Sequence, residues 1–264
     1  MATKDKTAEG ASTELDTVKA QQIALMQQSM EEDAGGGFEE AGASAYAIPF
    51  LQILQSGSPQ CKKSDGAYIK GAEEGMLFNT VTQELYDGTA GIEVIPVHYT
   101  QRFIEWKRRE DGGGFVAEHM QSQPTTKDDK GRDMLPNGNT LVDTRNHFVM
   151  IRKADGTLTP AQLTMSSTQL KKSRQWMSLM NGIKLKTNSG FVTAPMFSHV
   201  YKITTVPEKN DKGSWFGFAI ENLGKVEDIA EYVEAKAFRD AIKSGAAKPV
   251  MPVEEGMAET AEEF

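Results

Sequence analysis

Side chains that commonly carry catalysis or bind metals are few and scattered in this chain. The only cysteine, Cys61, lies beside two lysines but has no obvious partner base, which favours a bystander thiol. No G-x-S-x-G, H-E-x-x-H or Walker sequence occurs. We therefore expect no enzyme activity, no metal ion and no cofactor. The histidines, which never stand two or four residues apart as metal ligands often do, are His98, His119, His147 and His199.

The strongest signal for binding is a long span without carboxylates. Asp and Glu account for 37 of the 264 residues, yet none occurs in the 52 residues from Gly156 to Pro207. A surface that follows a phosphate backbone has to exclude carboxylates, because each of them would repel the phosphates. The basic residues of this span are Lys171, Lys172, Arg174, Lys184, Lys186 and Lys202.

Aromatic residues accompany the basic ones, as in proteins that bind single-stranded nucleic acid. Such proteins combine a basic groove for the phosphates with aromatic faces on which bases stack. Tyr201 lies within the acid-free span, and Trp215 follows it. A second basic and aromatic segment, "YTQRFIEWKRR", supplies further candidates: Tyr99, Arg102, Phe103, Trp106, Lys107, Arg108 and Arg109.

Structural roles compete with binding roles for several of these residues. Trp176 shares a helix face with Leu170, Met177 and Met180, so a core position is favoured over base stacking. Lys171 and Arg174 project from the opposite face, where a merely solvated surface explains them equally well. Barrel cores also use aromatic residues.

Charge is unevenly distributed along the chain. The total of −8 divides into −6 for residues 1–45, +3 for residues 46–248 and −5 for residues 249–264. The two ends are therefore acidic and the body is mildly basic. We expect a flexible acidic arm over 1–45, a nucleic-acid-binding core over 46–224, a C-terminal helix over 225–245 and a disordered acidic tail over 246–264.

The elements that would position these residues are mostly strands. An apolar run begins at Ile48, and Pro49 makes it an edge strand or the entry to a strand. Hairpins are expected at the turn 155–156 and through "EKNDKG". Ser166 and Gln169 have capping-box spacing at the start of a helix that Gly182 ends. This pattern predicts a mainly β (α+β) fold, an OB-like, partly closed barrel with one inserted helix and one C-terminal helix.

The acidic C-terminus ends on an aromatic residue. Its sequence "EEGMAETAEEF" follows a predicted β-core and a late helix, and a terminal Phe beside a carboxylate offers an apolar anchor to a partner. This layout resembles the single-stranded DNA-binding proteins of bacteriophages, which are OB-fold proteins with an acidic tail ending in Phe. The stretches "IPFLQILQSGSPQ", "AEEGMLFNTVTQELYDG" and "LTMSSTQLKKSRQWMSLM" are also similar to phage-encoded proteins.

The resemblance implies sequence-nonspecific binding and protection of single-stranded DNA in phage replication or recombination. Replication proteins such as a polymerase or a helicase would bind Glu262, Glu263 and Phe264 of the tail. The sequence does not distinguish single-stranded DNA from RNA as the ligand, and it allows a homo-oligomer. With no signal segment and no run of about 18 apolar residues, we expect no membrane partner and a place in the cytoplasm of an infected bacterium. The alternatives are a phage structural or assembly protein, and a binder of host RNA polymerase that acts through the acidic ends.

Overall fold

The structure, a computed structural model, describes residues 6–41, 47–211 and 213–247. It divides into two units, Met1–Ala45 and Tyr46–Phe264. The first unit contains helix α1 (Lys6–Glu32), whose side chains are all exposed from Thr17 onward. Ala, Gln, Met and Glu favour a helix even without packing.

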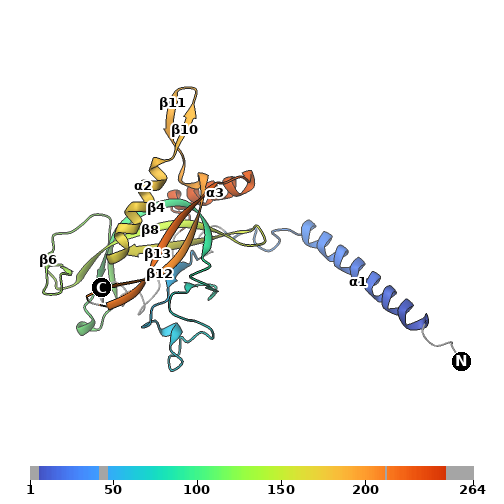
Figure 1. Ribbon diagram of the computed structural model, residues 1–264, viewed down its shortest axis with the longest axis horizontal. Coiled ribbons are helices and arrows are strands. Elements are labelled where there is room, and N and C mark those ends of the chain that lie inside the picture. The colour runs from blue at the N-terminus through green and yellow to red at the C-terminus, as the bar shows by residue number, and fades with distance from the viewer. Residues whose placement is uncertain (1–5, 42–46, 212, 248–264) are drawn as a thin grey trace. The chain divides into compact units, whose positions relative to one another are not determined.

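The second unit is built around one sheet that curls into a half-barrel (Figure 1). Its central order is β13-β12-β4-β8-β9-β1-β2-β3, with β5 paired to β4 and with β6 and β7 joined to β8. Among the described strand pairs, only β1 and β9 run parallel. The strands of this sheet are β1 (Phe50–Ile53), β2 (Leu77–Asn79), β3 (Leu85–Tyr86), β4 (Ile92–Trp106), β5 (Phe115–His119), β6 (Thr126–Lys127), β7 (Asp133–Met134), β8 (Thr140–Arg152), β9 (Leu158–Ser166), β12 (His199–Asn210) and β13 (Gly213–Lys225).

Two helices and a separate hairpin complete this unit. None of the described helices is long and apolar enough to cross a membrane. The expected class, a mainly β, partly closed OB-like barrel with an inserted helix and a C-terminal helix, is confirmed. The remaining elements are α2 (Leu170–Gly182), the hairpin of β10 (Lys184–Thr187) and β11 (Gly190–Thr193), α3 (Ile229–Ser244), and the short 3-10 helices Pro59–Cys61, Arg109–Asp111, Ser167–Gln169 and Met196–Ser198.

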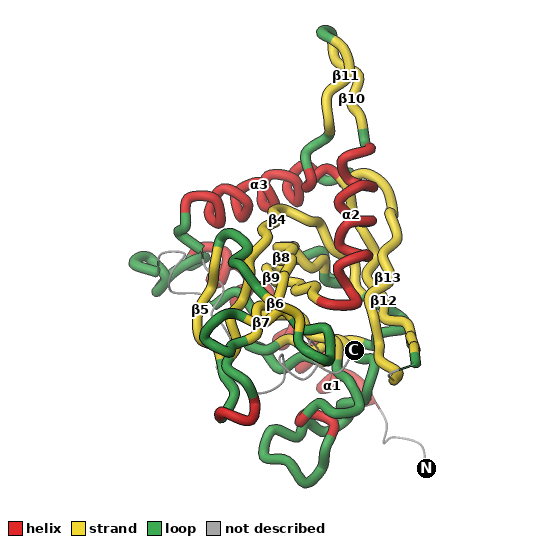
Figure 2. The backbone as a smooth tube through the Cα atoms, turned by 90° about the vertical axis from the view of Figure 1, so that its left-hand side faces the viewer, coloured by secondary structure: helices red, strands yellow, loops and turns green. Residues whose placement is uncertain are grey.

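The two helices cover opposite faces of the sheet. Successive strand residues point to opposite faces, so residues an odd number apart on β8 face opposite ways. His147 of β8 contacts Ser173 of α2 at 2.8 Å, whereas Arg152 of β8 forms an ion pair with Glu231 of α3. The α2 side is therefore the concave interior of the half-barrel, and α3 packs on the other side (Figure 2).

Helix α2 closes the main hydrophobic core. Its Trp176 and Met180 are 1% and 5% exposed and pack against the inner face of the sheet, which confirms the core position expected for Trp176. Burial of aromatic and aliphatic side chains is the main stabilising contribution to such a fold. The sheet residues of this core are Leu51, Leu77, Ile92, Val94, Val149, Ile151, Ala161, Leu163, Met165, Tyr201, Ile203 and Phe218.

Local turn signals in the sequence are largely reproduced. Strands β8 and β9 form the hairpin expected at residues 155–156, where Gly156 has a φ of +86°. Strands β12 and β13 form the second expected hairpin. Strand β1 pairs with both β2 and β9, so the run after Pro49 is an interior strand and Pro49 is its entry; the edge-strand alternative is wrong.

The predicted capping box does not form. Neither Ser166 nor Gln169 makes a side-chain capping bond to the helical segments that follow them. The Gln169 side chain instead accepts a hydrogen bond from the Phe218 N–H on β13. A tertiary contact therefore takes the group that local sequence spacing assigns to the helix.

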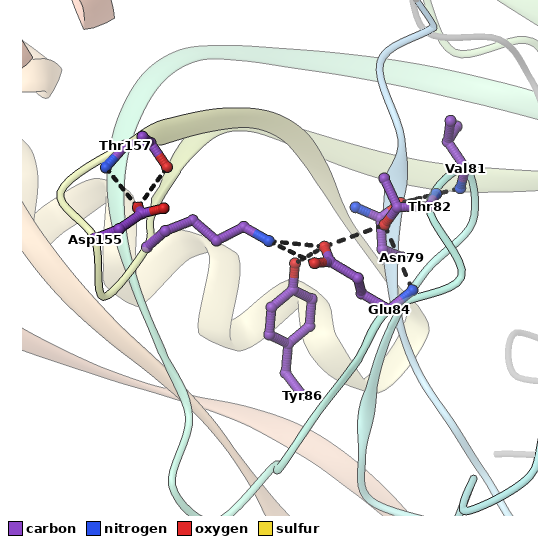
Figure 3. Close-up of polar contacts among 8 residues, drawn as sticks. Asn79, Val81, Thr82, Glu84, Tyr86, Asp155 and Thr157 are labelled. Carbon is purple, nitrogen blue, oxygen red and sulfur yellow. Dashed lines mark hydrogen bonds and ion pairs between the residues drawn. The ribbon is translucent and has the colours of Figure 1, made fainter. Parts of the chain in front are cut away.

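Polar contacts join the β2–β3 turn to the β8–β9 hairpin (Figure 3). The Nζ of Lys153 lies 2.7 and 2.8 Å from the two carboxylate oxygens of Glu84, which also accepts from the Tyr86 hydroxyl. Lys153 and Tyr86 both contribute to lowering the pKa of Glu84, with the lysine hydrogen bond as the largest cause. Asn79 and Asp155 shape the two turns by accepting backbone N–H bonds. The edge of the sheet is thus tied to its centre.

Candidate nucleic-acid interface

An open groove of about 1060 Å³ runs between α2 and the β12–β13 hairpin. Figure 2 shows α2 alongside these two strands. Lys171, Lys172 and Arg174 line it from α2, together with Glu208 from β12. The acid-free span contributes to both walls, since α2 and most of β12 lie within it. The structure therefore gathers three of the predicted basic residues in one concave surface.

The three basic residues of this groove differ in solvent exposure and in whether an acidic side chain pairs with them. Lys171 and Arg174 are exposed, and no described acidic side chain forms an ion pair with either. Lys172 is mostly buried, and its Nζ lies 2.6 Å from a carboxylate oxygen of Glu208. The charge of Lys172 is therefore compensated locally, and Lys171 and Arg174 are the residues of this helix available to a phosphate.

Glu208 also holds the indole ring of Trp215. The Trp215 Nε1–H donates to its second carboxylate oxygen at 2.9 Å, so one carboxylate orients both a lysine and an aromatic ring. Gly217 leaves room for this arrangement, because a Cβ there would lie 2.5 to 2.7 Å from the side-chain ends of Glu208, Lys172 and Gln169. Trp215 is half-buried at the edge of the groove, which places a predicted stacking residue beside the basic surface.

The β10–β11 hairpin carries the other exposed lysines of the span. It projects away from the sheet in both views (Figures 1 and 2). Lys184 and Lys186 are exposed, and Lys186 lies opposite Phe191, which is 73% exposed. Directly opposed residues share a face of a hairpin, so the lysine and the phenyl ring stand side by side.

Phe191 was missing from the residues expected to bind. The available signal was its setting in "TNSGFVT", a turn followed by an aromatic residue between polar neighbours. A two-stranded hairpin has no second layer to bury such a ring. Only the tertiary structure shows that these strands stand apart from the main sheet.

Tyr201 is buried and cannot stack on a base, so its predicted role in binding is wrong. It is 0% exposed, lies in the core with its ring edge against Trp176, and burial raises its pKa to about 12. Its neighbour Lys202 faces the other way and is partly exposed, between Glu93 and Glu221 in the strand register. Tyr201 therefore has no exposed ring face for a base, and Lys202 lies between two acidic residues instead of forming a free positive charge.

The segment 99–106 does not form a single basic and aromatic surface. It lies on β4, so Tyr99 and Phe103 face one side of the sheet while Arg102 and Trp106 face the other. On the concave side, the Tyr99 hydroxyl accepts a hydrogen bond from Arg145. On the α3 side, Arg102 pairs with Glu118 at 2.8 Å, and the Trp106 ring packs edge-on against Phe115.

Of the three basic residues after β4, Arg108 contacts other groups of the protein, and only Lys107 is described as exposed. The Arg108 Nε donates to the Gly138 carbonyl oxygen at 2.7 Å and lies 3.9 Å from an Asp111 carboxylate oxygen. Lys107 is exposed, and Arg109 begins a 3-10 helix while its side chain lies outside the described part of the structure. Since Arg102 is nine residues beyond Glu93 on β4, it lies about 30 Å along the strand from the position opposite Lys202. Arg102 is thus far from Lys202 along the sheet.

His147 is part of the hydrophobic core beneath α2. His147 is fully buried, stacks on Trp176 with ring centroids 4.7 Å apart, and lies 5.1 Å from the Tyr99 ring. Burial, and secondarily the charge of Arg145, lowers its pKa to about 3, so the ring stays neutral. Within the described residues, no group of three or more His, Cys, Asp or Glu side chains is arranged to hold a metal ion.

His119 helps to hold a buried carboxylate. Its Nε2 lies 2.8 Å from a carboxylate oxygen of Glu105, which is 5% exposed and also accepts hydrogen bonds from Asn137 and Asn139. These bonds, with that of Asn139 the strongest, keep the pKa of Glu105 below its usual value. The cluster ties the 135–139 turn to β4 and β5, which is a structural role.

The proposed contacts of the tail, Glu262, Glu263 and Phe264, lie outside the described residues. Comparison with curated proteins and with solved structures finds no match to this chain. A protein-family comparison does find one, over residues 18–248, which include the whole sheet, α2 and α3. On this match, the chain belongs to the bacteriophage family described as Pam3 phage gp34-like protein.

Proposed function

We propose that this phage protein binds single-stranded DNA without sequence-specific contacts in the α2 groove, and that it is not an enzyme. The observation that carries the proposal is the groove between α2 and the β12–β13 hairpin, where Lys171 and Arg174 are exposed without an acidic partner among the described residues. Trp215 at the groove edge and Phe191 on the projecting hairpin supply aromatic faces. Basic side chains would neutralise phosphates while these rings stack bases, as in other proteins that bind single strands.

The acidic ends fit this role as regulators and contacts. The C-terminal tail would recruit replication proteins such as a polymerase or a helicase through Glu262, Glu263 and Phe264. Its carboxylates would also compete with DNA for Lys171 and Arg174, because both are polyanionic. This part of the proposal is supported by the sequence alone.

The deciding experiment measures binding of fluorescent oligo-dT by anisotropy across a salt series. Each phosphate that a basic residue neutralises contributes about 0.7 to the slope of log K against log salt for a single strand. The double variant Lys171→Ala/Arg174→Ala should therefore bind more weakly at low salt and lower the slope by about 1.4, from two lost contacts.

A matched control removes two positive charges from the opposite face of the sheet. The variant Lys236→Ala/Lys243→Ala alters two exposed lysines on α3 and should leave the slope nearly unchanged. Equal losses in both variants would show that only net charge matters and would reject the groove. Absence of binding at micromolar protein in low salt would reject the function itself.

A second candidate function is that of a phage assembly protein, and α1 is the observation that favours it. This 27-residue helix exposes the apolar side chains of Val18, Ile23, Leu25, Met26 and Met30, which contact with another protein would bury. Light scattering with and without residues 1–45 tests this. A large oligomer that depends on the helix, together with no affinity for oligo-dT, would favour assembly.

A further inference from the structure

A second, smaller pocket lies at the seam where the half-barrel approaches closure. Strand β13 is one of the two end strands of the sheet order, and Gln55, just after β1, bridges to its free edge. The Gln55 side chain donates to the Phe216 carbonyl oxygen at 3.0 Å and accepts from the Phe216 N–H at 2.8 Å. The Gln169 side chain accepts from the Phe218 N–H in the same manner at 3.1 Å. The Gln55 amide therefore links the segment after β1 to β13, the Gln169 amide links the start of α2 to β13, and the pocket lies among these elements.

This seam pocket has a volume of about 80 Å³ and an uncharged lining. None of the described residues around it is acidic or basic. Amides and hydroxyls from Gln60, Ser166 and Thr168 meet the aromatic rings of Trp215 and Phe216. Within the described structure, the side chains of Gln60 and Ser166 have no hydrogen-bond partner, so their donors and acceptors are available to a ligand.

The backbone beside this pocket is held in an uncommon conformation. Ser167, between Ser166 and Thr168, has a φ of +48°, in the left-handed region that residues other than Gly rarely adopt. Such conformations are strained and tend to occur where the chain positions a binding or catalytic group. Here the left-handed residue stands between two lining side chains, Ser166 and Thr168.

The pocket adjoins the α2 groove, because Phe218 lines both. Gln169 lines the pocket at the start of α2, and Trp215 joins the two sites because its indole N–H is held by Glu208, the partner of Lys172 in the groove. A chain whose phosphates follow Lys171 and Arg174 would therefore pass the mouth of an uncharged, aromatic pocket.

We propose that the seam pocket binds one pyrimidine base of the strand held in the α2 groove, an inference that rests on the proposed function. An aromatic ring with amide and hydroxyl groups at its edge matches a nucleobase, which is flat, uncharged and hydrogen-bonding at its rim. A water needs about 10–15 Å³ of such volume, so the pocket of about 80 Å³ takes about five to eight groups of that size. This suits a single six-membered ring and is small for a bicyclic purine.

The first test compares oligo-dT with oligo-dA of equal length in low salt, using the full chain. We expect oligo-dT to bind about five-fold more tightly, and Gln60→Ala and Ser166→Ala each to reduce this preference about three-fold with an unchanged salt slope. Gln175→Ala, a glutamine that lines the groove and not the pocket, is the control and should keep the preference. Equal binding of the two oligonucleotides, or a preference that survives both pocket variants, would overturn the inference.

The second test uses thymidine alone and does not depend on DNA binding. Thymidine should shift the indole N–H resonance of Trp215 saturably, and that resonance is identified by its loss in Trp215→Phe; adenosine should shift it less. If thymidine binds while oligo-dT does not, the pocket stands and the proposed function fails. If oligo-dT binds while thymidine leaves Trp215 unshifted, the groove stands and the pocket proposal fails.

Discussion

Protonation of His147 should govern how the stability of this protein responds to mild acid. The ring is 0% exposed, stacks on Trp176, and its Nε2 lies 2.8 Å from the Ser173 Oγ of α2. Arg145 lies on the same strand face and repels any added positive charge. The folded protein therefore keeps this imidazole neutral under conditions in which an exposed histidine is protonated.

The magnitude follows from the two pKa values. The pKa of His147 falls from 6.5 to about 3 on folding, first through burial and then through Arg145. Between these values the unfolded chain binds a proton that the folded chain does not, so stability falls as the pH drops below about 6.5 and is insensitive to this group above it. At about 1.4 kcal/mol per pH unit, a change from pH 7 to pH 5 should cost about 2 kcal/mol from this residue.

The assay is urea unfolding followed by tryptophan fluorescence at pH 7 and pH 5 in the wild type and in His147→Gln. Gln retains a polar group toward Ser173 but cannot be protonated. Comparing the pH 7 to pH 5 loss within each protein cancels any constant destabilisation by the substitution. Carboxyl groups titrate mainly below pH 5, and the other histidines contribute equally to both proteins.

We expect the wild type to lose about 2 kcal/mol more than the variant between pH 7 and pH 5. The two proteins should respond alike between pH 7 and pH 8.5. Equal losses in the acid interval would mean that His147 is accessible to protons in the folded state, and would refute the packing of α2 over β8.

Three further predictions test the packing around Gly88, the buried position of Tyr201 and the role of the C-terminal tail. Gly88→Ala should lower the free energy of unfolding by about 3 kcal/mol, because its Cβ would overlap a backbone carbonyl oxygen and a threonine hydroxyl, whereas Gly66→Ala, with no atom within 4 Å, should be nearly neutral in the same urea titration. Tyr201→Phe should leave oligo-dT affinity unchanged and alter stability by less than about 1 kcal/mol, since the hydroxyl is buried without a hydrogen-bond partner in the described structure; a large loss of affinity would restore Tyr201 as a contact. Removal of residues 254–264 should tighten oligo-dT binding and abolish capture of replication proteins, while Phe264→Ala should abolish capture alone; unchanged affinity after removal would exclude competition by the tail.

Much of the fold could be predicted because local signals and burial agree. The Asp-Gly turn at Gly156 lies between two segments rich in apolar residues, which predicts a hairpin. In the structure β8 and β9 pair around this turn, and Gly156 has a left-handed backbone conformation. Trp176 could be assigned to the core because its apolar neighbours recur at helical spacing. The capping box at Ser166 failed because the Gln169 side chain has a better partner in Phe218, far away in the sequence.

The candidate site was harder to predict because it depends on partners from distant segments. Composition identified Lys171, Lys172 and Arg174 together, but only the fold shows that Glu208 compensates Lys172 and leaves the other two free. Strand alternation separated Arg102 from Tyr99, although they are three residues apart. Identical residue types thus received different roles according to what faces them.

By itself, the sequence determined the segregation of charge, the mostly β composition and the helix that carries the basic residues. These properties depend on residue type and short-range spacing, both of which can be read directly from the linear sequence. Only the tertiary structure decided that Tyr201 is buried, that Phe191 is exposed, and that two glutamine amides link β13 to the segment after β1 and to the start of α2, with a pocket among these elements. Burial and pairing are properties of residues brought together across the chain, and no local pattern specifies them.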